Sequence, residues 1–323
     1  MKPTKLILVA LASIVLLTSA TAPVYDYKSN TEQEAKAYPL KKYKKGLNFF
    51  IVSDWGWNGQ NYQQQVANQM GVQADSTGPK FIVSCGDNFQ INGVASTQDP
   101  LWLKNFENIY TKNSLHVDWY PVLGNHDYKG NTQAQLDYSK ISRRWRFEER
   151  YYSFTKKIND TISARFIFLD TPPLLSNYYN NDYPDIAKQD STKQIKWLNE
   201  TLANSKEQWK IVFGHHPIFS ASEKHGSSVE MIQRIKPILD KYNVQFYFSG
   251  HDHDMQHLHE KGKNTEYMVT GTGGATRPSS KNEQSIFSAS VPGYSIVSFH
   301  ADSIRVVFMG ANGQSQYTYD RKK

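Results

Sequence analysis

Short apolar runs, each followed by turn residues, recur along most of the chain and alternate with segments of helical periodicity. The runs cover residues 47–54, 80–87, 119–127, 164–170, 209–216, 244–253, 265–274 and 294–310, the last with a hairpin-like pattern. Between runs, residues 191–205 and 227–242 place apolar side chains at helical spacing, as crossover helices do. This alternation predicts an α/β fold built in layers.

The early apolar runs are continuous rather than alternating, which is typical of strands buried on both faces. Five of them end in a polar cluster, whose members are Asp54, Asp87, Asn125, His215, His251 and His253. In open α/β sheets, ligands bind outside the carboxyl ends of the strands. We therefore expect these side chains to converge at one edge of the sheet, although some 200 residues separate the first from the last.

The N-terminal segment has the pattern of a secretory signal. Two early lysines precede an apolar stretch over residues 6–17, and small residues follow at positions 20–22. The stretch has about 12 residues, fewer than the roughly 20 needed to cross a bilayer, so we expect cleavage rather than an uncleaved membrane anchor. The predicted organisation is a signal peptide over 1–22, a polar lead-in over 23–45 and a single domain over 46–323.

Composition narrows the classes of partner and the compartment. The formal net charge of the 323 residues is +7, but no nucleic-acid motif accompanies it, so we do not infer DNA or RNA binding. Cys85 is the single cysteine, so no internal disulfide can form, and its place in an apolar run predicts a small buried residue. We expect a secreted protein or one in an exported compartment (extracellular, lysosomal, vacuolar or periplasmic), without a membrane span after cleavage, and a monomer.

The polar cluster has the chemistry of a metal site. Two aspartates, one asparagine and three histidines, without a thiolate, suit first-row ions such as Mn, Fe, Zn, Ni or Co. Six ligands exceed what one tetrahedral zinc ion needs, and they fit two ions that share a bridging carboxylate. Such a pair clamps a phosphoryl group during displacement. Each histidine alone could equally be a hydrogen-bonded residue of the core or rim, so the prediction depends on the joint pattern.

Five short motifs resemble the ordered motifs of calcineurin-like metallophosphoesterases: SDWG at 53–56, CGDNF at 85–89, GNHD at 124–127, FGHHP at 213–217 and SGHDH at 249–253. Within that superfamily the chain is most similar to purple acid phosphatases of the small tartrate-resistant type, through Asp54 followed by Gly56 and through SEKHG at 222–226. The resemblance spans about residues 46–310. It implies a four-layer α/β/β/α sandwich of two mixed sheets flanked by helices.

The resemblance also implies a role for each site residue. Asp54 and His253 would bind the first metal, Asp87 would bridge both metals, and the second metal would be bound by Asn125, His215 and His251. His126 would stabilise the phosphoryl oxygens or protonate the leaving alkoxide, and His225 would line the pocket. The implied activity is that of an exported acid phosphatase, in which a metal-bound hydroxide attacks a small phosphorylated substrate or a phosphoprotein.

Gln90 departs from the family pattern. Purple enzymes have a tyrosine three residues after the bridging aspartate, and its phenolate binds ferric iron and gives the colour. The resemblance implies iron with iron, zinc or manganese, but a neutral carboxamide at Gln90 should hold ferric iron less firmly and favour a divalent pair. We predict a protein without the tyrosinate band. Three alternatives remain: Gln90 only fills space, another tyrosine, such as Tyr62 or Tyr128, reaches the metal, or the loss of this ligand marks an enzyme on its way to inactivity.

Two other functions fit the same sequence. A phosphodiesterase or pyrophosphatase would use the same two-metal chemistry, provided that the rim of the site leaves room for a second substituent. A non-catalytic surface scaffold that retained the fold would need no metal, although this chain keeps all six proposed ligands and His126. Rates on phosphate monoesters and diesters, together with metal content, separate these possibilities.

Overall fold

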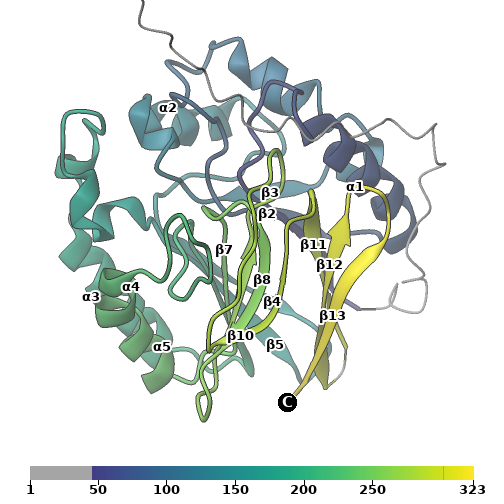
Figure 1. The fold of residues 1–323 in the computed structure, drawn as a ribbon, viewed down its shortest axis with the longest axis vertical. Coiled ribbons are helices and arrows are strands. Elements are labelled where there is room, and N and C mark those ends of the chain that lie inside the picture. Colours follow the sequence, from purple (N-terminus) through teal and green to yellow (C-terminus); the bar gives the residue numbers. More distant parts are fainter. Residues whose placement is uncertain (1–45, 301) are drawn as a thin grey trace, which may run out of the picture. The chain divides into compact units, whose positions relative to one another are not determined.

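Two mixed β-sheets form the centre of the described chain (Figure 1). This computed structural model describes residues 46–300 and 302–323, so the predicted signal peptide and polar lead-in lie outside the described residues. The first sheet has the order β13-β12-β11-β1-β2-β3, with bounds β1 Asn48–Val52, β2 Phe81–Ser84, β3 Asp118–Pro121, β11 Gly293–Phe299, β12 Ser303–Gly310 and β13 Ser315–Lys322. Strands β1, β2 and β3 run parallel, and β11 joins β1 in antiparallel pairing.

The second sheet has the order β10-β8-β9-β7-β6-β5-β4. Its strands are β4 Tyr152–Lys157, β5 Ser163–Phe168, β6 Trp209–Phe213, β7 Phe246–Ser249, β8 Met255–His259, β9 Glu266–Thr270 and β10 Ser285–Ala289. Strands β5, β6, β7 and β9 pair in parallel, and β4, β8 and β10 are added in antiparallel pairings. Both sheets are therefore mixed, as predicted.

Side chains of the central strands alternate between two cores. Phe49 and Ile51 of β1 belong to a core made from both sheets, which also holds Phe213 of β6. Phe50 and Val52 point to the opposite side and join a second core that includes residues of the helices. Every residue of β1, β2, β7, β9 and β11 is buried, as the continuous apolar runs predicted. This packing confirms the layered α/β architecture of two sheets flanked by helices.

The helices lie outside the sheets, with α3, α4 and α5 beside one another in Figure 1. Their bounds are α1 Gln63–Thr77, α2 Thr132–Asp137, α3 Ser191–Ala203, α4 Val229–Arg234 and α5 Lys236–Lys241. Shorter helical turns are η2 Leu103–Glu107, η3 Asn113–Leu115, η4 Asp127–Lys129, η5 Tyr138–Lys140, η6 Pro172–Leu174, η7 Ser176–Tyr178 and η8 Ile186–Lys188. The helix predicted over 191–205 is α3, which connects the parallel strands β5 and β6.

The helix predicted over 227–242 is two helices. Helix α4 ends at Arg234, and α5 begins at Lys236 with Pro237 in its first turn. Proline lacks an N–H group and its ring clashes with the preceding turn, so a continuous helix through this position is disfavoured. The prediction of a helical connection between β6 and β7 is correct, and the prediction that it is one continuous helix is wrong.

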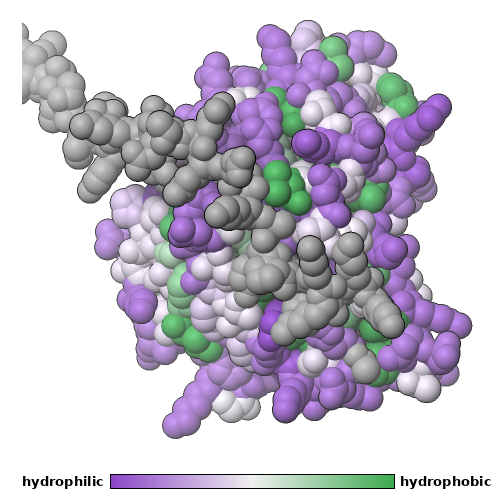
Figure 2. All heavy atoms as spheres, turned by 90° about the vertical axis from the view of Figure 1, so that its right-hand side faces the viewer, coloured by the Kyte–Doolittle hydropathy of each residue, from purple (hydrophilic) through white to green (hydrophobic). Residues whose placement is uncertain are grey.

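The surface of the described chain is mainly polar where Figure 2 shows it. Hydrophilic side chains prevail on this face, and hydrophobic residues appear as separate small groups. Among the described residues, no helix is long and apolar enough to cross a membrane.

Candidate metal centre

The six predicted metal ligands lie in loops at the carboxyl ends of five strands. Three loops leave the first sheet after β1, β2 and β3, and two leave the second sheet after β6 and β7. The ligands are thus contributed by both sheets rather than by one edge of a single sheet, and the loops meet where the two sheets face each other. The structure brings together every residue of the predicted set, which is Asp54, Asp87, Asn125, His215, His251 and His253.

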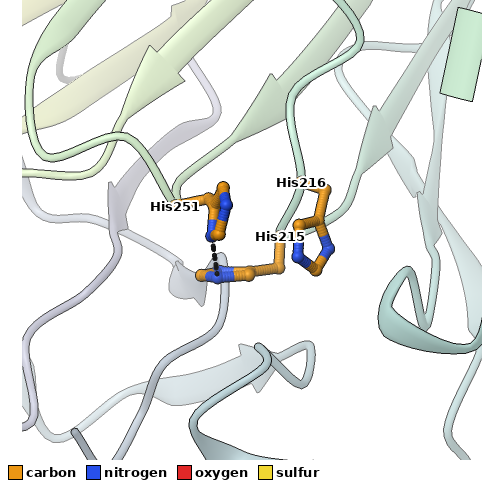
Figure 3. Close-up of side chains that lie close together, drawn as sticks. All are labelled: His215, His216 and His251. Carbon is orange, nitrogen blue, oxygen red and sulfur yellow. Dashed lines mark hydrogen bonds between the residues drawn. The ribbon is translucent and has the colours of Figure 1, made fainter. Parts of the chain in front are cut away.

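His215 lies at the centre of one half of this set. Its Nε2 atom is 3.5 Å from Asp87 Oδ1, 3.1 Å from Asn125 Oδ1 and 3.3 Å from His251 Nδ1. Figure 3 shows the His251 ring directed at the His215 ring, although the two residues come from different loops. These are the four residues predicted for the bridged second metal.

Asp54 and His253 make the other half, with Asp54 Oδ1 3.4 Å from His253 Nε2. The two halves are continuous, because ligand atoms of Asp54, Asp87 and His215 all lie within 4.8 Å of one another.

Three of these residues have backbone conformations that are rare outside glycine. The φ angles are 58° at Asp54, 48° at Asp87 and 68° at His251. Such left-handed residues cost on the order of 1–3 kcal/mol each and concentrate at functional sites. Hydrogen bonds hold the loops in place: the His251 N–H donates to Asp54 Oδ2 at 2.9 Å, and the His126 N–H donates to Asp87 Oδ1 at 2.8 Å.

Two glycines leave the space that the carboxylates occupy. A Cβ atom on Gly124 would clash with the side chain and the backbone N of Asp87, and a Cβ atom on Gly250 would clash with Asp54 and Ser53. Close approach of one loop to another therefore requires glycine at both positions. The GNHD and SGHDH motifs thus each contain a proposed ligand and a glycine, and the glycine leaves room for the aspartate of a neighbouring loop.

Charge in the cluster suits cations. Burial raises the pKa of Asp54, but the hydrogen bond and charge of His253 and the charge of His215 outweigh it, so that this carboxyl has a lowered pKa and is ionised. Burial lowers the pKa of His251 well below its ordinary value, and neighbouring histidines lower it further. Ionised carboxylates and neutral imidazoles are the forms that bind metal ions.

The donor set fits a metal centre on direct structural grounds. Asp54 Oδ1 is buried; His253 Nε2 lies 3.4 Å from it, longer than an ordinary N–H···O hydrogen bond, and no other described residue donates to it. A buried carboxylate oxygen that is so weakly satisfied is costly unless something else, such as a cation, satisfies it. His215 Nδ1 lies 2.9 Å from the Cys85 carbonyl oxygen, so Nδ1 carries the proton and Nε2 is the ring nitrogen that faces the other proposed ligands.

His216 is adjacent to this cluster but differs from the ligands. Figure 3 shows its ring beside that of His215. Its Nδ1 is 2.9 Å from Thr171 Oγ1 and its Nε2 is 2.8 Å from the Tyr178 hydroxyl, so both ring nitrogens have hydroxyl partners. Burial lowers its pKa well below the ordinary range. We interpret His216 as a packing residue that supports the loop after β6.

The two predicted catalytic histidines line a cavity of about 620 Å³ that also contacts ligands of both halves. His126 Nδ1 lies 3.1 Å from the Ile91 carbonyl oxygen. His225 Nδ1 lies 2.7 Å from Asp252 Oδ1, and its ring stacks on His251 with 4.2 Å between ring centroids. In each case the contact occupies Nδ1 and leaves Nε2 for the cavity.

Sequence reasoning missed the residues that orient these histidines. Asp252 lies between two predicted ligands in the SGHDH motif, and that position was the available signal. Its carboxylate accepts hydrogen bonds from His225 and from the Ser220 hydroxyl. The contact of Ile91 is made by its backbone, so the identity of the side chain gave no signal.

Gln90 is buried and contacts the predicted bridging residue. Its Nε2 atom lies 3.3 Å from Asp87 Oδ2, an amide-to-carboxylate hydrogen bond. Two tyrosines were considered as replacements for the missing metal-binding tyrosine. Tyr128 donates its hydroxyl hydrogen bond to Asp170, and Tyr62 packs against the second core, which includes residues of the helices. In the described structure Gln90 therefore supports the carboxylate, with its amide nitrogen toward it.

Comparisons with known proteins agree with this geometry. A model of the calcineurin-like phosphoesterase family matches residues 47–255. Tartrate-resistant acid phosphatase type 5 of Oryctolagus cuniculus is 33% identical over 84% of this chain and 89% of that protein. Purple acid phosphatase 4 of Arabidopsis thaliana is 35% identical over 86% of this chain and 84% of its own length.

Solved structures with the same fold include enzymes and a protein of another kind. GAP50, described as the anchor in the inner membrane complex of Plasmodium, has a TM-score of 0.75 at 26% identity, with 85% of this chain and 88% of that chain covered. Purple acid phosphatase PPD1 from yellow lupin (Lupinus luteus) seeds has a TM-score of 0.61 at 16% identity, with 85% and 53% covered. At that identity the lupin structure supports the fold alone.

Proposed function

The chain belongs to the calcineurin-like phosphoesterase family, and from this premise we propose that it is an exported acid phosphatase that hydrolyses phosphate monoesters at a dinuclear metal centre. The observation that carries the proposal is the convergence of six oxygen and nitrogen ligands from both sheets beside a cavity that two further histidines line. The signal-peptide pattern over 1–22 supports export, and we propose that residues 46–323 fold as a single domain.

The residues of the chain take distinct parts in this reaction. Two bound metal ions would supply positive charge that activates a water molecule and stabilises the phosphoryl oxygens. Asp54 and His253 would hold one ion, Asn125, His215 and His251 the other, and Asp87 both. His126 and His225 line the cavity and have partners at Nδ1, so the Nε2 of either could hydrogen-bond a phosphoryl oxygen or donate a proton to the leaving alcohol.

Metal analysis joined to an activity screen tests the proposal. The purified protein should hold two ions per chain by mass spectrometry and should hydrolyse p-nitrophenyl phosphate after loading with Mn, Fe, Zn or Co. Asp87→Ala should lose both bound metal and activity, because one carboxylate joins the two sites. The proposal of an enzyme would be wrong if the protein holds two ions and hydrolyses no phosphate ester with any of these metals.

Gln90 sets the expected identity of the ions. A neutral amide that hydrogen-bonds Asp87 supplies no phenolate to ferric iron. We therefore propose a divalent pair and expect the iron-loaded protein to lack a strong visible band. A tyrosinate band in that spectrum would contradict this assignment without affecting the phosphatase proposal.

The same experiments separate the alternatives. A phosphodiesterase would hydrolyse the bis(p-nitrophenyl) ester faster than the monoester. A scaffold need not bind two ions, and the Asp87→Ala variant of a scaffold would have the same metal content and the same lack of activity as the wild type. The ionised Asp54 and the weakly satisfied oxygen of that carboxylate support a metal-binding protein over a scaffold, because a scaffold gains nothing from their burial cost.

A further inference from the structure

Three cationic side chains line the cavity beside the metal centre: Lys129, Lys224 and Arg277. Lys129 and Lys224 belong to loops that carry a site histidine, and Arg277 belongs to the loop after β9, which contacts the loop of His253. The Lys129 N–H donates to the His126 carbonyl at 3.2 Å, and the Arg277 N–H donates to the His253 carbonyl at 2.8 Å. Lys224 directly precedes His225. The cations therefore approach the cavity from three different loops.

These cations are not neutralised by the protein. Within residues 46–300 and 302–323, no carboxylate forms an ion pair with any of the three side chains. The other acidic group of the lining, apart from the predicted ligand Asp87, is Glu230, and its Oε1 accepts a hydrogen bond from the Ser176 N–H at 2.9 Å. Among the residues that line the cavity there are thus three cationic side chains and two carboxylates, an excess of one positive charge before any metal ion is counted, and the three cations attract anions.

The cavity has room for more than the reacting phosphate. Its volume of about 620 Å³ falls within the range of roughly 300–1,000 Å³ that holds small organic ligands. Tyr178 and Tyr183 line one side, with ring centroids 4.9 Å apart in an edge-to-face arrangement. Lys129 Nζ lies 5.9 Å from the centroid of Tyr183, so one of the cations is placed beside this aromatic wall.

We propose that Lys129, Lys224 and Arg277 form a second anion-binding subsite, and that the preferred substrates are small phosphate monoesters whose alcohol part carries another anionic group. This inference rests on the proposed phosphatase function, because it assigns the reacting phosphate to the metal centre. The second group is a carboxylate or a phosphate, since both accept charge-assisted hydrogen bonds from lysine and arginine. The aromatic wall favours an alcohol part with a flat, apolar body.

A matched pair of substrates tests the subsite. Phenyl phosphate and 3-carboxyphenyl phosphate share the reacting ester and differ in one remote carboxylate. We expect kcat/KM of the metal-loaded protein to be about tenfold higher for the carboxylated ester at low ionic strength, the ratio of one good charged contact. Raising the salt concentration should reduce the ratio, because exposed charges are screened.

Variants then assign the preference to these residues. Lys129→Ala, Lys224→Ala and Arg277→Ala should each lower the ratio, and the triple variant should bring it to about one, because kcat/KM falls further for the carboxylated ester than for phenyl phosphate, whose phosphate loses only the field of the cations. Lys129→Arg, which keeps the charge, should retain the preference. Lys193→Ala is the matched control, because this exposed lysine of α3 does not line the cavity.

Binding of non-hydrolysable analogues separates this inference from the proposed function. Calorimetry with phenylphosphonate and 3-carboxyphenylphosphonate needs no turnover. A binding preference that the triple variant loses supports the subsite even if no ester is hydrolysed, in which case the phosphatase proposal fails alone. Equal affinities for the two analogues, or a loss of preference in Lys193→Ala as large as in the triple variant, would overturn the subsite even if the enzyme is active.

Discussion

Ile91 has a backbone conformation that its own side chain disfavours. Its φ angle is 75°, and the Asn92 N–H donates across it to the Gln90 carbonyl at 3.1 Å, as in a classic γ-turn. A β-branched residue in this region is an outlier, and its side chain is 58% exposed, so packing does not explain it. The turn directs the Ile91 carbonyl to His126 Nδ1. We interpret the strain as the cost of orienting His126.

Substitution at position 91 tests this interpretation. Ile91→Pro fixes φ near −65°, which removes the turn and its carbonyl contact, whereas Ile91→Gly adopts a positive φ without strain. We expect Ile91→Pro to lower kcat on alkyl phosphates by about 10–100-fold, part of the effect of a proton donor. The loss should be smaller on p-nitrophenyl phosphate, whose leaving group needs little protonation.

The glycine variant is the control for this prediction. Ile91→Gly should keep kcat on both substrates within about threefold of the parent. Among the backbone hydrogen bonds of the described residues, none uses the Ile91 N–H, so proline at this position removes no such bond. Equal rates of the two variants on alkyl phosphates would show that the Ile91 carbonyl does not orient His126.

The convergence of the six proposed ligands could be predicted from sequence because each follows a strand in a recognisable motif. Their supporting contacts could not. The Ile91 carbonyl reaches His126 because of a positive φ angle, which an isoleucine in the sequence does not predict. Asp252 contacts His225 although 27 positions separate the two residues in the sequence. The local pattern identifies which side chain is available for chemistry, whereas its orientation depends on contacts between loops that only the folded chain brings together.

At the scale of elements, sequence periodicity found nine of the described strands and missed β4, β8, β10, β13 and the helix α1. This helix contains five glutamines, of which Gln63, Gln69 and Gln73 are buried, so its apolar stripe of Val66, Met70 and Ala74 is too narrow to identify a helix from sequence. Gln63 shows why: its side-chain oxygen accepts hydrogen bonds from the N–H groups of Trp57 and Gly59, and its amide donates to the Asn105 carbonyl. Polar residues that support the loop after β1 replaced the expected apolar ones.

Asp170 joins several elements at the end of β5. Its N–H donates to Gln194 of α3 at 2.8 Å, its Oδ2 accepts from the Tyr128 hydroxyl, and Arg150 lies next to that hydroxyl at 3.2 Å. Burial raises the pKa of Asp170 to about 6, although the charge of Arg150 and the hydrogen bond from Tyr128 act against it. A buried carboxyl with a raised pKa makes the fold most stable when it is protonated.

The pH dependence of unfolding should show this group. Because the folded-state pKa of Asp170, about 6, lies above its ordinary value of 3.8, the folded state binds more protons between these limits, and stability falls as pH rises through them. Over that window the wild type should lose up to about 3 kcal/mol relative to Asp170→Asn, which stays neutral. Urea unfolding of both proteins at pH 4, 5, 6 and 7.5 measures the difference.

The exposed Asp182→Asn variant is the control for the Asp170 step. Its stability relative to the wild type should not change with pH over the same window. A constant difference between the wild type and Asp170→Asn at all four pH values would show that the buried carboxyl does not titrate in this range. Greater stability at acidic pH would suit an enzyme of an acidic compartment.

At the scale of the molecule, the metal centre lies where two sheets meet. The pattern of apolar runs that end in polar residues predicted that the site residues converge at one edge of one sheet. It could not assign the runs to two different sheets, because all runs look alike in sequence when every residue in them is buried. In the structure Asp54, Asp87 and Asn125 follow strands of one sheet, while His215 and His251 follow strands of the other. Bound ions would therefore connect the sheets as well as perform chemistry.

Chelation should consequently lower the stability of the whole domain. Ions that bind only the folded state stabilise it by about 2.7 kcal/mol per site at a hundredfold excess over Kd, and two such sites correspond to a Tm difference of roughly 10 °C for a protein of this size. Without ions, the ionised Asp54, the weakly satisfied oxygen of that carboxylate and three left-handed residues remain uncompensated. Thermal unfolding with and without a chelator measures the shift, and added Mn or Zn should restore the original Tm.

Two variants are the controls. The Tm of Asp87→Ala should change little on chelation, whereas the Tm of Asp182→Asn should change as that of the wild type does. If the chelator strips both ions, as mass spectrometry would show, and Tm does not move, the ions do not link the sheets, because ligands drawn from both sheets cannot lose their common partner without cost.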